Sequence, residues 1–410
     1  MASFDSIVEE ATTRGSKGIP GVVLAAIDRN GNSLYTKSSG HTSLDPSAPT
    51  ISPSNIFRLA SCTKLVTSIA ALQCVSRGIL SLDDPSLITK HLPELASQPI
   101  ITLNTGPDAS STPFHYTQPR NGITLRMLLT HSSGVGYDLE GRLKAWRQAR
   151  GEPSLAVSGR VLAAFSTPLL FEPGEGMAYG GGLDWAGILI SRATGRSLGA
   201  YMQQHIFAPL DMRRTTFRPA ERADVSGALV QVVARAPDGS LVPFAANDEA
   251  AEEGGGGGLY ASVEDYMALL ADLLREEPRV LGREMVGLLF ATQFAEGSAA
   301  LGGLKACRNV YETMTGALTR GLRVNHGLGG VLVVEDAMGL GRTNGTLTWG
   351  GSFGLMWFVN RERGVAAMYA SQVFPPGDGR NGELMRGFVK EVWSILAERE
   401  GGENVGIWYR

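Results

Sequence analysis

The segment from residue 59 to residue 75 reads LASCTKLVTSIAALQCV, and the architecture can be inferred outward from it. Its apolar residues recur at helical spacing, and Gly78 is a suitable residue to end the helix. Ser61 falls at the start of this predicted helix. Lys64 follows three residues later and therefore lies on the same face, one turn behind the serine.

This spacing suits nucleophilic catalysis. A serine hydroxyl is a poor nucleophile until a base removes its proton. Lys64 can act on Ser61 in this way if burial and the positive potential of the helix N-terminus lower the lysine pKa. The backbone N–H of Ser61 can in addition stabilise an oxyanion. A lone Ser-x-x-Lys is weak evidence, because the spacing is common by chance and the serine can simply cap the helix.

The chain on either side of this helix indicates an α+β architecture. The sequence predicts the following elements: a helix over 1–10, strands over 22–27 and 33–39 with a turn at 28–32, strands over 347–349, 355–359 and 365–371, and a final helix over 382–398. Antiparallel strands with helices at both chain ends favour one sheet domain built from the two termini. We expect residues 1–85 and 315–410 to form this discontinuous domain. Residues 86–314 are expected to form a mainly helical domain with loops over the active site.

The composition is that of an ordinary globular protein. The 410 residues include 37 Lys and Arg and 40 Asp and Glu, and the net charge of −3 suggests neither nucleic acid nor a membrane as a partner. No apolar run is long enough to span a bilayer, and the N-terminus lacks the features of a secretory signal. The three cysteines suit neither a disulfide framework nor a metal site. We therefore expect a cytoplasmic protein without a metal or cofactor.

Further motifs resemble those of the serine β-lactamase and penicillin-binding superfamily. Ser61-Cys62-Thr63-Lys64 is similar to its active-site motif. The segments that resemble class C β-lactamase-like esterases are 78–85 (GILSLDDP), 123–134 (ITLRMLLTHSSG), 209–212 (PLDM) and 257–260 (GGLY). The segments most similar to fungal lovastatin-type acyltransferases are 59–78, 179–187 (YGGGLDWAG) and 327–330 (GLGG). The resemblance covers nearly the whole chain. It implies the β-lactamase/transpeptidase-like fold, with the active site between the sheet and the helical domain.

The resemblance implies that Tyr179 is catalytic together with Ser61 and Lys64. A phenol is ordinarily too weak an acid to serve as a base near neutrality, but beside Lys64 the pair is expected to relay the proton of Ser61. The family usually has Tyr-x-Asn here, whereas this chain has Gly181 in place of the Asn. Gly181 stays among the predicted substrate-binding residues, although no polar contact is carried over to it.

Residues 349–352 (WGGS) occupy the place of the usual Lys-Thr-Gly, on an edge strand beside the nucleophile. The backbone N–H of Gly351 or Ser352 is expected to be the second oxyanion donor, and the sequence does not decide between them. The missing lysine would have bound the carboxylate of a β-lactam, and Trp349 offers an apolar wall instead. This favours an ester or thioester with a hydrophobic acceptor. We predict that Trp349, Gly350 and Tyr137 bind substrate.

Five other features are interpreted as structural. His131 is not needed as a base beside the Lys/Tyr pair, and Asp83-Asp84 indicates a turn better than a metal pair. Residues 254–258 lack the lysine of a phosphate loop and suggest a mobile turn near the site. Cys62 is expected to be buried behind its helix, and Trp185 is expected to pack in the core.

Together these features predict a serine acyltransferase. An acyl group would pass from a thioester or ester to Ser61, and then to a hydroxyl or amine of a small secondary metabolite such as a polyketide. The resemblance implies a donor held on an acyl carrier protein or CoA. A carboxylesterase, in which water is the acceptor, would use the same residues and is the first alternative. Less favoured alternatives are a β-lactamase, a non-catalytic binding protein, and an enzyme of cyclisation or amide formation.

Overall fold

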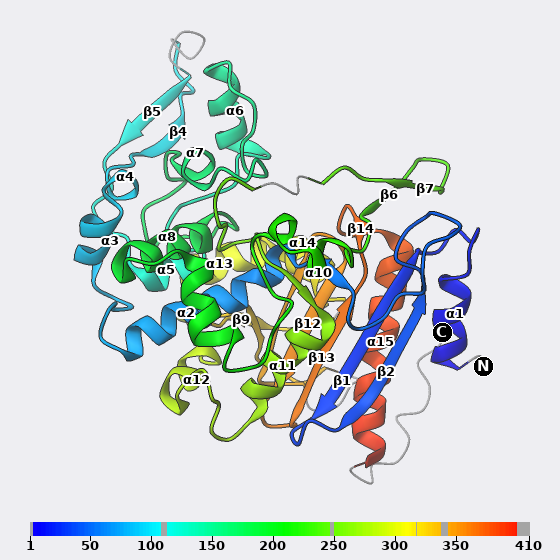
Figure 1. The fold of residues 1–410 in the computed structure, drawn as a ribbon. Helices are drawn as coiled ribbons and strands as arrows, with labels where there is room; N and C mark the ends of the chain where they lie inside the picture. Colours follow the sequence, from blue (N-terminus) through cyan, green and yellow to red (C-terminus); the bar gives the residue numbers. More distant parts are fainter. Residues whose placement is uncertain (1–2, 108–112, 247–249, 317, 338–342, 400–410) are drawn as a thin grey trace.

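The computed structural model describes residues 3–107, 113–246, 250–316, 318–337 and 343–399, and its centre is a seven-stranded antiparallel sheet (Figure 1). The strands lie in the order β2 (Ser33–Gly40), β1 (Gly21–Asp28), β13 (Val365–Ala370), β12 (Leu355–Asn360), β11 (Thr346–Gly351), β10 (Val331–Val333) and β9 (Val324–His326). β1 pairs with β13, with Val23 opposite Ala370, so that strands from the two ends of the chain lie side by side in the sheet.

Helices cover both faces of this sheet. α1 (Phe4–Ala11) and α15 (Gly379–Arg399) share one hydrophobic core with one face. α2 (Thr63–Ser76) and α11 (Val263–Leu274) share a larger core with the other. Every residue of β12 and β13 is consequently buried, which is why these strands are apolar apart from Asn360 at the end of β12. The predicted α+β class, an antiparallel sheet flanked by terminal helices, is confirmed.

The first hairpin shows how local sequence specifies the sheet. Asp28 Oδ1 accepts hydrogen bonds from the backbone N–H groups of Asn30 and Asn32, both at 2.9 Å. Gly31 has a φ of 81°, a left-handed conformation that costs glycine little. The turn predicted at 28–32 is therefore present, and it aligns the two strands on either side.

The middle of the chain is mainly helical. Its helices are α3 (Pro85–His91), α4 (Pro93–Ala96), α5 (Leu125–Leu129), α6 (Gly141–Ala149), α7 (Val161–Phe165), α8 (Gly182–Thr194), α9 (Leu198–Met202), α10 (Ala223–Ser226), α12 (Arg283–Leu289), α13 (Ala299–Ala306) and α14 (Arg308–Met314). α11 lies within the predicted helical domain and yet packs on the sheet. The division at residues 85/86 and 314/315 stays a prediction.

Three small sheets were not predicted. They consist of β3 (Ile56–Arg58) with β8 (Tyr260–Ser262), β4 (Ile100–Leu103) with β5 (Phe114–Thr117), and β14 (Val373–Phe374) with β6 (Val233–Arg235) and β7 (Leu241–Pro243). β3 directly precedes the turn that carries Ser61, and β8 directly follows the glycine-rich segment 254–258. The pairing of β3 with β8 therefore brings these two segments together.

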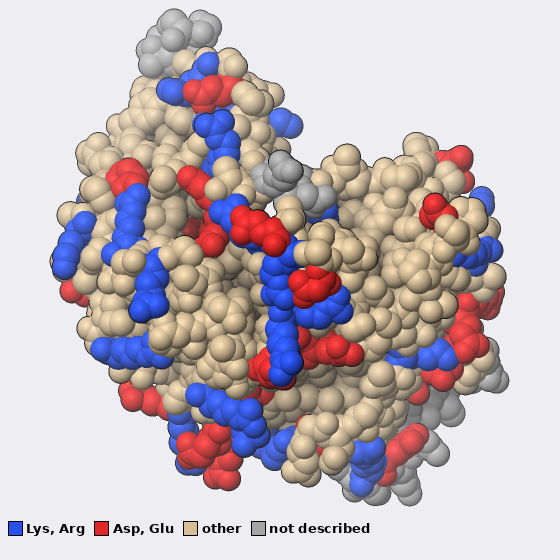
Figure 2. Space-filling model, viewed as in Figure 1, with Lys and Arg blue, Asp and Glu red and all other residues tan. Residues whose placement is uncertain are grey.

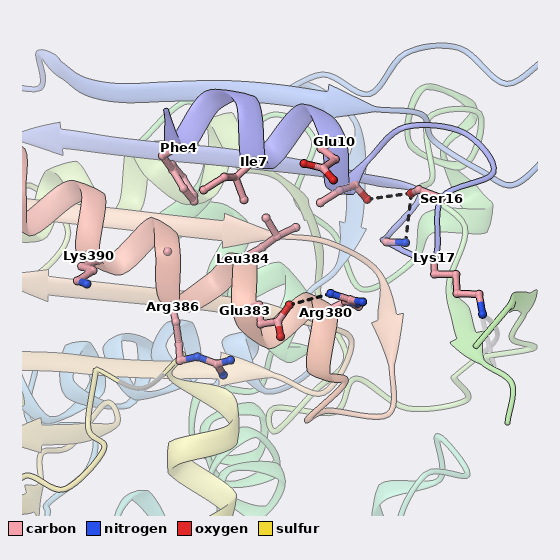
Figure 3. Close-up of a pocket in the computed structure, with 13 residues that line it drawn as sticks. Phe4, Ile7, Glu10, Ser16, Lys17, Arg380, Glu383, Leu384, Arg386 and Lys390 are labelled. Atoms are coloured by element: carbon pink, nitrogen blue, oxygen red, sulfur yellow. Dashed lines mark hydrogen bonds and ion pairs between the residues drawn. The ribbon is translucent and has the colours of Figure 1, made fainter. Parts of the chain in front are cut away.

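The surface carries charges of both signs. On the face seen in Figure 2, Lys and Arg side chains are interspersed with Asp and Glu. A groove lies between α1 and α15, where Phe4 and Ile7 face Leu384 and charged side chains such as Arg380 and Glu383 form the rim (Figure 3). Across the residues that the structure describes, no helix combines the length and the apolar character that a membrane span needs.

Candidate active site

Ser61 lies in a 3₁₀ turn, Ala60–Cys62, immediately before α2. Ala60 has a φ of 44°, which residues other than glycine seldom adopt and which the surroundings must therefore enforce. The Tyr266 hydroxyl donates to the carbonyl of Cys62 at 2.9 Å and helps to hold the turn. Cys62 is fully buried as predicted, and burial raises the pKa of its thiol.

The three predicted catalytic side chains come together at this turn. Tyr179 Oη donates to Ser61 Oγ at 2.6 Å, and Lys64 Nζ donates to the same oxygen at 3.2 Å. The Lys64 ammonium also lies 4.8 Å from the centre of the Tyr179 ring. Ser61 and Lys64 come from one helix start, whereas Tyr179 precedes α8. The arrangement is that of a nucleophile between a cation and a phenol.

Lys64 is buried and has two further hydrogen-bond partners. Its Nζ donates to the carbonyl of Gly256 at 2.7 Å and to Tyr137 Oη at 3.3 Å. Burial lowers the pKa of Lys64, but Tyr137, Tyr179 and the carboxyl of Asp184 together raise that pKa above its ordinary value. The condition under which Lys64 could itself be the base, a lowered pKa, is therefore not met. The sequence pattern placed Tyr179 beside Lys64 but did not place Tyr137 or Asp184 there.

Tyr137 and Trp349, both predicted to bind substrate, contact the side chains that are predicted to be catalytic. The Tyr137 ring lies 5.5 Å from the Tyr179 ring, and burial raises the pKa of the Tyr137 phenol. Trp349 is only 3% exposed, and its indole N–H donates to Tyr179 Oη at 3.4 Å. Trp349 is thus more than an apolar wall, because it also supplies a hydrogen bond to the phenol of Tyr179.

Gly351 brings the end of β11 against the nucleophile turn. A Cβ atom placed on Gly351 would lie 2.4 Å from the carbonyl oxygen of Leu59, so that a larger residue would force the strand away. Ser352 follows directly and is half-buried. The oxyanion role of the Gly351 or Ser352 N–H, and the choice between them, stay predictions.

Gly350 and Gly181 are close-packing positions. A Cβ on Gly350 would lie 2.2 Å from the carbonyl oxygen of Met314, and one on Gly181 would lie 2.4 Å from the Phe165 ring. Each glycine therefore faces protein that leaves no room for a side chain. Their predicted contact with substrate stays a prediction.

The glycine-rich turn at 254–258 is anchored, and the expectation of a mobile turn is wrong. The carbonyl of Gly256 accepts a hydrogen bond from Lys64 Nζ, and the carbonyl of Gly255 accepts one from Thr67 Oγ1, both at 2.7 Å. The N–H of Gly256 donates to Asp184 Oδ1 at 2.9 Å. Asp184 and Thr67 were missed as site residues. The available signal was an acidic residue between Leu183 and Trp185 in an otherwise apolar run.

The features interpreted as structural have structural partners. His131 Nδ1 accepts from the N–H of Gly180 at 3.4 Å, and its ring lies 4.8 Å from that of Tyr179. Asp83 pairs with Arg126 at 2.7 Å, and Asp84 caps α3. Trp185 is fully buried, and its indole N–H donates to the carbonyl of Phe165 at 3.1 Å.

Comparison with known proteins agrees with this geometry. The model of the Beta-lactamase family matches residues 4–388. Acyltransferase calJ of Penicillium decumbens is 33% identical over 96% of this chain and 98% of its own length. Lovastatin esterase of Penicillium rubens is 35% identical over 92% of this chain and 94% of its own.

A solved structure of similar fold is simvastatin synthase (LovD) from Aspergillus terreus. It superposes with a TM-score of 0.86 at 29% sequence identity and covers 98% of this chain and 100% of its own. The predicted β-lactamase/transpeptidase-like fold is thereby confirmed. From the family match, the full-length relatives and the shared fold, it follows that this chain belongs to the β-lactamase family, among its serine acyltransferases and esterases.

Proposed function

We propose that this enzyme transfers an acyl group from a thioester or ester, through an acyl-enzyme on Ser61, to a hydroxyl or amine of a small secondary metabolite. The observation that carries the proposal is the convergence of Tyr179 Oη and Lys64 Nζ on Ser61 Oγ, at 2.6 and 3.2 Å. The nearby N–H groups of Ser61 and of Gly351 or Ser352 supply the oxyanion site that acyl transfer requires.

The first half-reaction makes the acyl-enzyme. In this step Tyr179 first releases its own proton to solvent beside the Lys64 ammonium, and its oxygen then accepts the proton of Ser61 as Oγ attacks the acyl carbon. The two backbone N–H groups stabilise the negative charge of the tetrahedral intermediate. The bond to the leaving sulfur or oxygen then breaks, and the leaving group takes the proton from Tyr179.

The second half-reaction reverses these steps with the acceptor. Its hydroxyl or amine gives a proton to Tyr179 and attacks the acyl carbon on Ser61. The bond to Ser61 Oγ breaks, and the serine regains its proton from Tyr179. Trp349 donates to the Tyr179 oxygen and stabilises its negative charge whenever Tyr179 is deprotonated.

The class of substrate follows from the walls of the site. Tyr137, Tyr179 and Trp349 present aromatic rings to one another at centre distances of 5.2 and 5.5 Å, and a hydrophobic acceptor fits such walls better than a β-lactam carboxylate. A relative named acyltransferase supports transfer. We further propose a donor on an acyl carrier protein or CoA and a cytoplasmic setting, which suits the three free cysteines.

The test is mass spectrometry of the intact protein after mixing with a short-chain acyl thioester. The wild type should gain the mass of one acyl group, and Ser61→Ala should gain none. Ser68→Ala is a matched control, because Ser68 is a buried serine further along α2, and this variant should be acylated normally. An adduct on Ser61→Ala at the wild-type rate would remove Ser61 as the nucleophile.

Hydrolysis is the second candidate function, and the similarity to lovastatin esterase favours it. The two outcomes are separated by the product ratio when acyl-enzyme is supplied with a hydrophobic alcohol in water. Ester product in excess of free acid supports transfer. Free acid alone, at every alcohol concentration, would establish an esterase.

A further inference from the structure

We propose that Asp184 is a positioning residue of the active site, which holds Lys64 in place through the peptide group of Gly256. The inference rests on the proposed catalytic role of Lys64. Among the described side chains, Asp184 makes no hydrogen bond to Ser61, Lys64 or Tyr179, and it would act on Lys64 through the backbone of Gly256.

The connection runs from the Asp184 carboxylate through the peptide group of Gly256 to the Lys64 ammonium. The Asp184 carboxylate accepts from the N–H of Gly256 at 2.9 Å, and the carbonyl of Gly256 accepts from Lys64 Nζ at 2.7 Å. Lys64 Nζ in turn donates to Ser61 Oγ. Hydrogen bonds in such a chain polarise one another, so that the negative charge of Asp184 strengthens the hold of the carbonyl on the ammonium.

Asp184 itself is fixed and enclosed. It is 5% exposed and lies in the first turn of α8, where the free N–H groups and the positive end of the helix favour a carboxylate. A buried carboxylate is costly unless hydrogen bonds and a nearby cation compensate it. Burial raises the pKa of Asp184, and the charge of Lys64 and the Gly256 N–H oppose that rise.

The turn is shaped to make this connection. A Cβ on Gly256 would lie 2.2 Å from Asp184 Oδ2, and a Cβ on Gly255 would lie 2.4 Å from the carbonyl of Leu183. Only glycine allows the turn to approach α8 so closely. Thr67 Oγ1 donates to the carbonyl of Gly255 at 2.7 Å and anchors the same turn without a charge.

The groups around Lys64 make the role of Asp184 specific. In the described part of the chain they include Cys62, His131, Tyr137 and Tyr179, and Asp184 is the one carboxylate of this set. Its charge favours the protonated lysine. A change that removes only this charge should therefore alter the titration of Lys64 and not merely the stability of the turn.

The experiment compares Asp184→Asn with Thr67→Val by the pH dependence of Ser61 acylation, measured by mass spectrometry of the intact protein. Asp184→Asn keeps the side-chain shape and loses the charge. We expect it to slow acylation by about tenfold or more and to move the limb governed by Lys64 to lower pH by about half a unit or more. Thr67→Val should slow acylation and leave that limb where it is.

The proposal would be overturned if Asp184→Asn lost rate as Thr67→Val does but left the Lys64-governed limb of the pH profile at the wild-type pH. Asp184 would then be a structural residue. Asp184→Glu keeps the charge and replaces the Asn variant if that variant fails to fold. The limb of its pH profile that is governed by Lys64 should stay at the wild-type pH, and a shift to lower pH by about half a unit or more would likewise overturn the proposal. Lys64→Ala distinguishes the two levels. If that variant is acylated normally, the proposed function of Lys64 fails and the positioning role fails with it.

Discussion

Ser61 Oγ accepts one hydrogen bond from Tyr179 and one from Lys64 in the resting arrangement. The reaction needs the opposite direction between Ser61 and Tyr179, because the serine must lose its proton before it attacks. A lysine that stays protonated can favour this reversal by stabilising negative charge on the phenol oxygen. The raised pKa of Lys64 therefore fits the role of a fixed cation better than that of the base itself.

Removing either partner of Ser61 should slow the chemistry strongly. Lys64→Ala and Tyr179→Phe are each expected to lower the rate of acylation by about 10²–10⁴, the usual contribution of a positioned proton-transfer group. Rapid-quench mixing with an acyl thioester measures this rate. Tyr201→Phe, which alters a buried tyrosine on α9, should acylate normally. A near-normal rate in either test variant would exclude that residue from the mechanism.

The indole N–H of Trp349 should have a smaller effect. Trp349→Phe keeps an aromatic ring and removes the donor to Tyr179, so that acylation should slow by about tenfold, the worth of one hydrogen bond of ~1.4 kcal/mol. The matched change Trp185→Phe removes the donor to Phe165. It should lower the melting temperature without slowing acylation in the folded protein. Equal rate losses in both variants would contradict a specific role for Trp349.

At the scale of elements, the site depends on how closely β11 approaches the nucleophile turn. The two elements are nearly 300 residues apart in sequence, and they touch because Gly351 has no side chain between β11 and Leu59. If the N–H groups of the turn and of the strand are the oxyanion donors, as proposed, they can converge on one oxygen only while this contact is kept.

Gly351→Ala tests this contact. The added methyl group would lie 2.4 Å from the carbonyl of Leu59, and we expect the displaced strand to lower acylation by about 10², as for loss of one oxyanion donor. Circular dichroism should show an intact fold. Gly287→Ala is the control, because a methyl group there meets nothing within 4 Å in the middle of α12, and it should stabilise the protein slightly. Normal acylation by Gly351→Ala would disprove the close-contact role.

The sequence predicted those elements whose pattern is local. β12 and β13 are apolar runs bounded by turns, and the serine helix has its own spacing and its own stop at Gly78. The β3–β8 pair could not be foreseen, because three-residue strands carry little pattern and Ile56 meets Ser262 only through tertiary packing. In the same way, Ser61, Lys64 and Tyr179 were found by motif. Asp184 was missed, because its contact with Gly256 spans 72 residues.

At the scale of the whole molecule, two buried imidazoles link stability to pH. The His131 and His326 rings lie 5.8 Å apart between the Tyr179 ring and the core. Burial lowers the pKa of His131 well below its ordinary value and lowers the pKa of His326 to about 4. Both rings are therefore neutral in the folded protein near neutrality.

Stability should fall as the solution becomes acidic. In the unfolded chain, His326 takes up a proton near pH ~6.5, whereas in the folded chain it does so only at about 4. The unfolded state thus binds more protons between these values. The contribution is complete above pH ~6.5 and is lost towards pH 4, and for His326 it amounts to about 3 kcal/mol.

Urea unfolding at pH 7.5 and at pH 5 measures this effect. The free energy of unfolding should be lower at pH 5, and His326→Gln should reduce the difference between the two values. His115 is exposed, and His115→Gln should leave the difference unchanged. A difference that His326→Gln does not alter would mean that other groups cause the acid sensitivity.

The pairing of β1 with β13 also sets when the enzyme can first act. About 340 residues separate Asp28 from Val365, its partner in the sheet, so that the sheet closes only when nearly all of the chain has been made. During synthesis, Ser61 leaves the ribosome roughly 15–60 s before the first residue of β13, at 5–20 residues per second. The nascent serine has no oxyanion strand beside it in that interval. We therefore expect that a chain released before β13 is made does not form an acyl-enzyme on Ser61.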